Sequence, residues 1–241
     1  MDKAIYQIST LNALALGYTR KVVSIEDLLA HGDTGLGTFE NLDGEMIVLD
    51  GHCYRASDNG AVTEPPLTMG VPFASVAVLK GISEFEIGEL DSVSALKDFL
   101  NLKIEEDFGL NSMHIVRIDG FFAKVDARSE NGLRTQHVEL KELLGKYQKA
   151  FTFENLRGSL VCLYYPDYME GINAAGWHFH FISEDKTRGG HVFDVVLKSG
   201  VARLDKISKL EMQLPREAAF DTYSLTKASQ KDIKQVEQGK G

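Results

Sequence analysis

Three of the seven histidines in this 241-residue chain stand within fourteen residues of one another, in the segment "GWHFHFISEDKTRGGHVFD" at 176–194. In a β-strand, residues two apart project to the same face, so His178 and His180 would present their imidazoles side by side. The stretch "EDKTRGG" has the composition of a hairpin turn, and it would return His191 on an antiparallel strand, where cross-strand neighbours lie roughly 4.5–5.5 Å apart at Cβ. Three neutral imidazoles on one face, with positions left open for water or substrate, form the ligand set of a catalytic zinc site.

The same residues allow other interpretations. Any one of these histidines alone would more often be an ordinary core or surface residue, and only their common face favours a metal. A structural zinc completed by Cys162 or an acid is one alternative, but structural sites usually close with C-x-x-C pairs, and Cys53 and Cys162 form none. The run "HFHFISE" also matches the opening H-x-H-x₃-E of a cupin metal motif, with Glu184 as the acid. No histidine follows His191, so the second cupin motif is missing, and a cupin-like metal-dependent oxygenase or isomerase stays the alternative function.

Local signals predict the elements that must hold these side chains. Residues 24–32 predict a short helix, because a serine N-cap is followed three residues later by an aspartate. Residues 44–57 predict two strands around an Asp-Gly dipeptide, which favours hairpin turns. Apolar residues at helical spacing predict a helix over 92–107. From residue 158 onward extended stretches dominate, so we expect an α+β fold with mainly antiparallel or mixed sheets.

The chain has no Pro/Gly/Ser-rich linker, and its 44% apolar content is ordinary for a globular protein. We therefore expect residues 1–241 to form a single catalytic unit with two β-rich lobes and a few helices. The approximate lobes are 1–150, with mixed sheet and helices, and 151–241, which carries the metal site on its hairpin.

Charge and cysteine content narrow the class of partner. The net charge of −9 argues against nucleic acid and against an anionic membrane surface, so we expect a small-molecule substrate. We expect the N-terminal residues to be neither a signal peptide nor a membrane span. Two isolated cysteines fit a reducing compartment, which makes a cytoplasmic location the simplest expectation.

Two long blocks of the sequence resemble the alpha-acetolactate decarboxylase family. The first runs through "IYQIST" and "SIEDLLAHGDTGLGTFENLDGEMIVLDGHCYRA", and the second is "GSLVCLYYPDYMEGINAAGWHFHFISEDKTRGGHVFD". The resemblance covers nearly the whole chain, and it implies a homodimeric, cytoplasmic zinc enzyme of α+β build. Such a carboxy-lyase would convert 2-acetolactate to acetoin and carbon dioxide on the route toward 2,3-butanediol, with Zn²⁺ held by His178, His180 and His191.

The resemblance also implies catalytic residues. The family's acid in "LDGE" falls on Glu45, the threonine of "GLGTF" on Thr38, the active-site arginine on Arg128, and a C-terminal glutamate on Glu237. The family usually follows its arginine with a Q-x-x-P-Y-like segment, which this chain lacks, so Arg134 competes with Arg128. A planar guanidinium suits the departing carboxylate. Glu45 is expected to protonate the enediolate left by decarboxylation, with Glu237 as second candidate or as a metal-side ligand.

Overall fold

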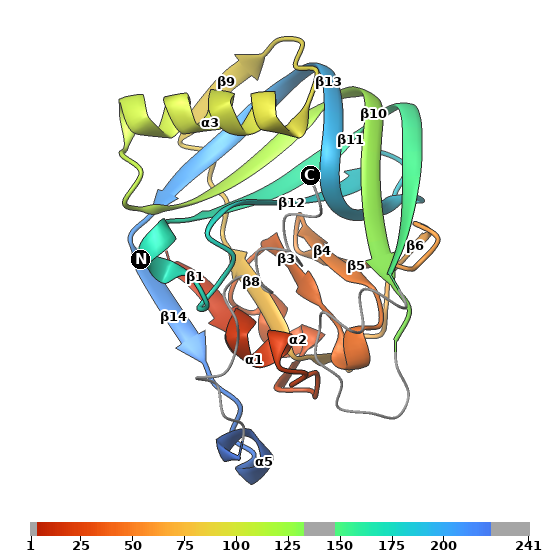
Figure 1. Cartoon of the computed structure of the whole chain (residues 1–241), viewed down its shortest axis with the longest axis vertical. Coiled ribbons are helices and arrows are strands. Elements are labelled where there is room, and N and C mark those ends of the chain that lie inside the picture. Colours follow the sequence, from red (N-terminus) through yellow and green to blue (C-terminus); the bar gives the residue numbers. More distant parts are fainter. Residues whose placement is uncertain (1–3, 133–147, 223–241) are drawn as a thin grey trace.

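Two β-sheets packed against each other make up most of the computed structural model, which describes residues 4–132 and 148–222 (Figure 1). The larger sheet has the order β14-β1-β8-β3-β4-β5-β6. Its strands are β1 (Ala4–Ile8), β3 (Thr34–Thr38), β4 (Glu45–Leu49), β5 (His52–Ala56), β6 (Val62–Thr63), β8 (Phe73–Ala77) and β14 (Lys209–Gln213). All its neighbours pair antiparallel except β1 and β14, which run parallel.

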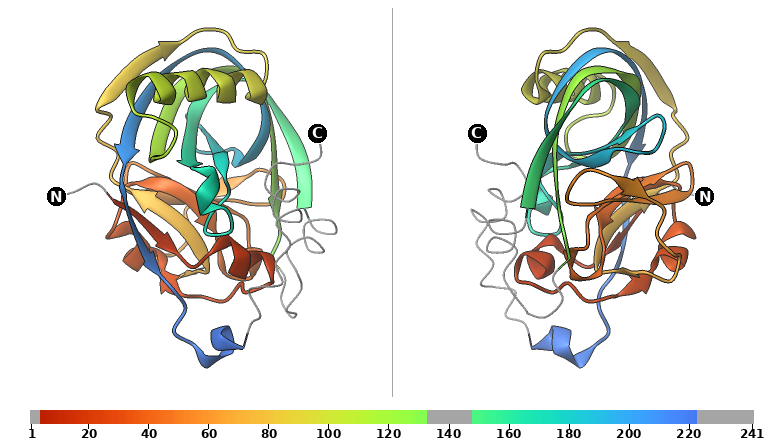
Figure 2. Two further views of the ribbon diagram at one scale, coloured as in Figure 1. Left: turned by 60° about the vertical axis from the view of Figure 1, so that its left-hand side comes forward. Right: turned by 90° about the vertical axis from the view of Figure 1, so that its right-hand side faces the viewer.

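The second sheet has the order β10-β11-β12-β13-β9, and β10 pairs with β13 as well. Its strands are β9 (Ser83–Ile87), β10 (Met113–Glu130), β11 (Gln148–Tyr165), β12 (Gly176–Ser183) and β13 (Gly189–Ile207). The extra pairing closes β10, β11, β12 and β13 into a ring, and Figure 2 shows the long strands curling round to meet. Two short strands, β2 (Val23–Ser24) and β7 (Gly70–Val71), form a separate pair.

Within residues 4–132 and 148–222 the helices are few and, apart from α3, short. They are α1 (Leu11–Ala15), α2 (Ile25–Leu29), α3 (Val93–Asp107) and α5 (Ala218–Asp221), with the 3₁₀ turns η1 (Glu40–Leu42) and η2 (Asp167–Met169). The capping box predicted for α2 is present, since Ser24 accepts from the Asp27 N–H while the Asp27 carboxylate accepts from the Ser24 N–H. None of the helices in the described residues is long and apolar enough to span a membrane.

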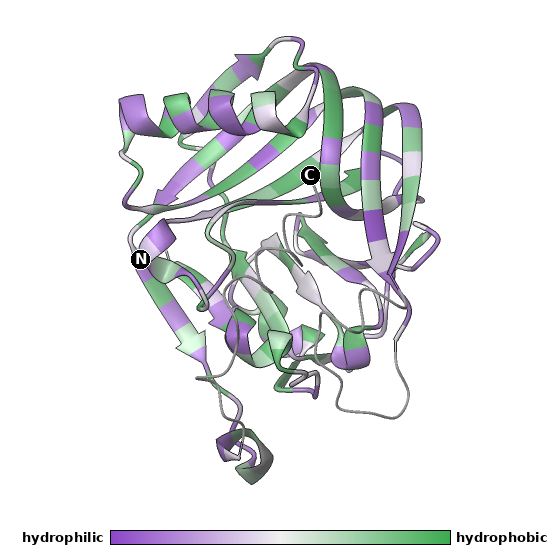
Figure 3. Ribbon diagram, in the orientation of Figure 1, coloured by the Kyte–Doolittle hydropathy of each residue, from purple (hydrophilic) through white to green (hydrophobic). Residues whose placement is uncertain are grey.

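Helix α3 covers the outer side of the five-stranded sheet (Figure 1). Its buried residues Leu96, Leu100 and Ile104 are four apart, so they form one apolar stripe, and hydrophilic segments alternate with hydrophobic ones along the helix (Figure 3). The stripe packs into a core that includes the β12 residues Trp177 and Phe179. The opposite face of β12, which carries the even-numbered histidines, is therefore left to face the other sheet.

A second apolar layer joins the two sheets. Ile47 of β4 and Tyr54 of β5 share a buried cluster with Val161 of β11 and Ile182 of β12. The predicted α+β, β-rich class is confirmed, and the histidines lie at the junction between the sheets.

The sheets divide the chain at a different place from the predicted lobes. Residue 150 falls inside β11, which pairs with β10 along its length. The change of sheet comes instead between Ala77 and Ser83, and β14 then returns the chain to the first sheet beside β1. The sequence could not indicate this, because a loop composition marks the end of a strand but not which sheet the next strand joins.

Candidate metal centre

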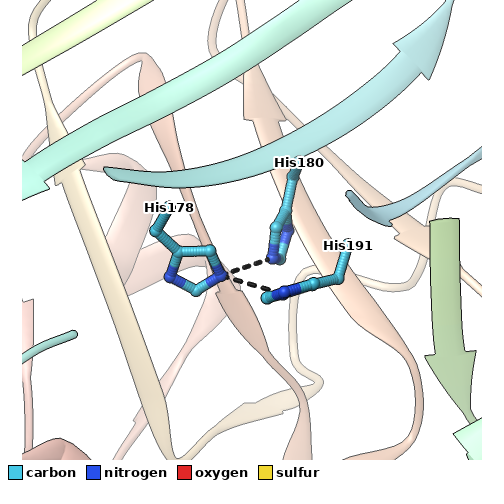
Figure 4. Close-up of side chains that lie close together, drawn as sticks. All are labelled: His178, His180 and His191. Carbon is cyan, nitrogen blue, oxygen red and sulfur yellow. Dashed lines mark hydrogen bonds between the residues drawn. The ribbon is translucent and has the colours of Figure 1, made fainter. Parts of the chain in front are cut away.

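The three clustered histidines turn their rings toward one another (Figure 4). Nε2 of His178 lies 3.0 Å from Nδ1 of His191 and 3.2 Å from Nε2 of His180. One ligand atom from each residue lies within 4.8 Å of the others, and all three side chains are buried.

Strand register sets this geometry. His180 of β12 pairs directly with His191 of β13, as the hairpin interpretation predicted. His191 in turn pairs with Arg128 of β10 on its other side. Three neighbouring strands thus carry one row of site residues, and His178 joins the row because it stands two residues before His180.

The surroundings keep two of the imidazoles neutral. Burial, together with the positive charges of Arg128 and Lys97, lowers the pKa of His178 to about 3. Burial also holds the pKa of His180 well below its usual range. Nδ1 of His180 lies 2.7 Å from the carbonyl oxygen of Met46, a partner that can only accept, so Nδ1 carries the proton. Its Nε2 therefore presents a lone pair to the centre of the cluster.

This donor set fits a divalent metal. Nε2 of His178 approaches both Nδ1 of His191 and Nε2 of His180, and Nε2 of His180 offers a lone pair and no proton. A cation bound by one lone pair from each ring would satisfy all three. Nitrogens bound tetrahedrally to zinc at 2.0–2.1 Å lie roughly 3.3 Å from each other, close to the spacing of these rings.

Arg128 is buried beside the cluster, with 8% of its surface exposed. Its Nη2 lies 3.1 Å from Nε2 of His191. A β-bulge precedes it, because Asp126 pairs with Asp194 while Ala127 pairs with Val192, which leaves Phe193 as an extra residue. β-Bulges often redirect side chains next to active sites, and this one shifts the strand register at the pair Arg128 and His191.

Glu45 reaches the cluster from the other sheet. Its Oε2 lies 3.4 Å from Nε2 of His180, and 9% of the residue is exposed. The hydroxyl of Ser129 accepts from the Glu45 N–H at 3.2 Å and donates to the carbonyl of Ala56 at 2.8 Å. Ser129 therefore links the strand of Arg128 to the strand of Glu45. Ser129 was not a candidate from the sequence, where only its position next to Arg128 could have drawn attention to it.

Thr38 lies directly across from Glu45 on the neighbouring strand β3. Its hydroxyl donates to the carbonyl of Gly44 at 3.0 Å, so it holds the backbone just before Glu45. Gly44 has a φ of +97°, and a Cβ there would meet the Ala56 carbonyl oxygen at 2.5 Å. Only glycine fits at this corner, which explains the residue before the acid.

Other residues weighed from the sequence lie elsewhere. Arg134 and Glu237 fall outside the described residues. Glu184 is exposed in the turn after β12 and does not belong to the group of residues that could hold a metal. The acidic ligand that the cupin interpretation requires is therefore not at the cluster. Cys162 pairs with Phe179 and lies in the core under α3, away from the histidine face.

A cavity of about 20 Å³ opens beside His178 and His191. Lys97 of α3 lines it together with Val93 and Trp177. Lys97 was not a candidate from the sequence, because a lysine on an amphipathic helix is normally a solvated surface residue.

Comparisons with known proteins agree on one family. A family model described as alpha-acetolactate decarboxylase matches residues 5–227. The alpha-acetolactate decarboxylase of Methanosarcina mazei is 36% identical over 233 residues, which cover 97% of this chain and 80% of that protein. The protein of the same name from Brevibacillus brevis is 34% identical over 236 residues, with the same two coverages. The crystal structure of alpha-acetolactate decarboxylase from Bacillus subtilis strain 168 matches with a TM-score of 0.92 at 31% identity, covering 97% of this chain and 99% of that one.

Proposed function

Because the chain belongs to the alpha-acetolactate decarboxylase family, whose members are carboxy-lyases, we propose that it decarboxylates 2-acetolactate to acetoin and carbon dioxide with zinc held by His178, His180 and His191. One observation carries the proposal: three buried imidazoles converge at a point flanked by a guanidinium and a carboxylate. When bound, the zinc would supply a Lewis acid for the substrate's hydroxyl and ketone oxygens, where negative charge develops.

Arg128 would hold the carboxylate that leaves. A guanidinium presents two parallel N–H donors to a carboxylate and fixes its plane. The bond that breaks joins the carboxylate carbon to C2, and its electron pair stays on C2 to give an enediolate. Since Arg128 is buried next to His191, it would orient the breaking bond without competition from bulk water.

Glu45 would then return a proton to carbon. A carboxylic acid that lies on one side of the site protonates one face of the enediolate, which yields a single acetoin enantiomer. Its position is supported from both sides, by Ser129 at its backbone N–H and by Thr38 at the preceding carbonyl. Glu237 stays the second proposed acid or a metal-side ligand.

The direct test is turnover by the purified chain. We expect racemic 2-acetolactate to yield acetoin and carbon dioxide, the rate to fall on chelation, and zinc to restore it. Oxygen consumption with iron dependence would instead support the metal-dependent oxygenase that was considered from the sequence. A chain that produces no acetoin with zinc present would contradict the proposal.

We also propose that the protein works as a cytoplasmic homodimer in acetoin and butanediol formation. Free cysteines support the reducing compartment, because Cys53 and Cys162 are both buried and unbridged. The dimer rests on the family resemblance, and light scattering of the purified chain would measure it.

A further inference from the structure

A lysine from the outer helix borders the histidine cluster. Lys97 stands one turn after Val93 in α3, and both side chains line the cavity that also borders His178 and His191. The cavity measures about 20 Å³, which is room for about one water molecule.

An opening in the sheet gives this helix access to the site. β12 and β13 pair only over His180–His191, Phe181–Gly190 and Ile182–Gly189. Residues 176–179 of β12 pair with β11 alone, so the two strands part just where His178 lies. A side chain on the α3 side of the sheet can therefore act on the histidine side.

Among the described residues, no acidic side chain pairs with the charge of Lys97. Its Nζ lies 6.0 Å from the ring centroid of Phe179, and within the described residues it makes neither a hydrogen bond nor an ion pair. Burial lowers the pKa of Lys97, and its positive charge contributes to the lowered pKa of His178. A cation partly withdrawn from water without an anion is costly, and an anion bound nearby would offset that cost.

Two acceptors fix the helix in place. The Asp194 carboxylate accepts from the Val93 N–H at 2.9 Å, and the Ser92 hydroxyl accepts from the Ala95 N–H at 3.2 Å. Asp194 lies on β13 three residues after His191, so the start of α3 is tied to the strand that carries the site. The position of Lys97 follows from this attachment.

We propose that Lys97 is a positioning residue that selects for the carboxylate of the substrate by placing a second positive charge across the cavity from His178 and His191. The inference rests on the proposed function for the substrate's identity, but its test does not require turnover. Arg128 would hold the carboxylate directly, whereas Lys97 would act through the one-water cavity. It would thereby favour 2-hydroxy acid anions over neutral analogues of the same shape.

The test compares an anion with its neutral analogue. The probes are 2-hydroxyisobutyrate, which has the hydroxyl and carboxylate but no ketone to react, and its uncharged amide. Isothermal titration calorimetry would measure the Kd of each probe for the zinc-loaded wild type, Lys97→Met, Lys97→Arg and Lys103→Met. Lys103 is the matched control, since it lies on the same helix and pairs with Glu106 at the surface.

We expect Lys97→Met to weaken 2-hydroxyisobutyrate about tenfold and to leave the amide within about twofold. Lys97→Arg keeps the charge and should stay within about threefold of wild type, and Lys103→Met should match wild type. Unchanged carboxylate affinity in Lys97→Met would overturn the inference. An equal loss for carboxylate and amide, or no carboxylate binding by the wild type, would overturn it as well. Normal probe binding without acetoin formation would contradict the proposed function and leave this inference standing.

Discussion

At the scale of single residues, His180 shows how the backbone prepares a ligand. The carbonyl of Met46 fixes the proton on Nδ1, and burial keeps the ring neutral, so its Nε2 faces the cluster ready to bind. The position of the proton on the His180 ring is thus set by a residue of the other sheet. Substitution of Met46 cannot remove a carbonyl, so the histidines themselves are the informative positions.

Replacing His178 or His191 by Ala should remove bound zinc and lower turnover below about one per cent of wild type, since a three-nitrogen site would lose a ligand. Metal content measured by mass spectrometry and acetoin formation would check both effects. His52→Ala is the control, because His52 is exposed beside Glu64 and distant from the cluster. A variant that keeps both zinc and activity would refute the ligand assignment.

Glu45→Gln should retain zinc but lower kcat by about 100-fold or more, because an amide cannot donate the proton that a carboxylic acid gives to carbon. Acetoin production and metal content, measured on the same sample, separate these effects. Activity within about tenfold of wild type, equivalent to ~1.4 kcal/mol, would rule out the proton-donor role.

His114 predicts a pH dependence of stability that is independent of the site. It is fully buried between Phe108 and Tyr164, and burial lowers its pKa to about 4. The unfolded chain, with a pKa of about 6.5, binds more protons between these values, so the free energy of unfolding falls as pH drops from about 6.5 to 4. The loss is of the order of 3 kcal/mol.

Chemical denaturation at several pH values would measure this effect. His114→Phe should flatten the dependence over the same interval, because phenylalanine fills the aromatic site without titrating. Parallel curves for the variant and the wild type would show that His114 is not the group responsible.

At the scale of secondary-structure elements, local chemistry explains what the sequence could predict. The capping box of α2, the apolar stripe of α3 and the Asp-Gly turn of β4–β5 are signals between near neighbours, and each element formed where predicted. The β12–β13 hairpin belongs to the same class, because two alternating strands and a polar turn fix its register.

Contacts between elements that are distant in the sequence could not be predicted from such local signals. Glu45 meets His180 because β4 and β12 belong to sheets that pack together, and no pattern in either strand encodes that packing. Only the family resemblance connected the two residues. Lys97 was missed for a similar reason, since its role depends on where β12 and β13 part.

The N-cap of α3 gives a prediction at this scale. Ser92→Ala removes the acceptor for the Ala95 N–H and should lower the free energy of unfolding by ~1 kcal/mol. Urea denaturation would measure the change. Ser94→Ala makes the same substitution at an exposed position inside the helix, and it should change stability by less than about 0.5 kcal/mol. Equal effects of the two substitutions would show that the cap contributes nothing specific.

At the scale of the whole molecule, the three-histidine cluster lies between two sheets that have apolar cores of their own. One core joins α3 to the five-stranded sheet, and another lies within the seven-stranded sheet and α2. A third joins the sheets directly. The fold therefore does not depend on the metal for its apolar burial.

Chelation should accordingly abolish activity before it disturbs the structure. We expect the far-ultraviolet circular dichroism of the chelated protein to match the zinc-loaded form, and added zinc to restore turnover. Unfolding that accompanies chelation would instead indicate a structural zinc, as in small domains that fold only around their metal.

The parallel pairing of β1 with β14 has a consequence for synthesis on the ribosome. β1 acquires its β8 partner once residue 77 is made, but its other edge waits for residues 209–213. At usual elongation rates that interval lasts about 7 to 27 seconds. During it the nascent chain presents an unpaired edge beside a nearly complete sheet, which is a template for pairing with another chain. Among the described residues β14 is the last strand to leave the ribosome, and its pairing covers this edge of β1.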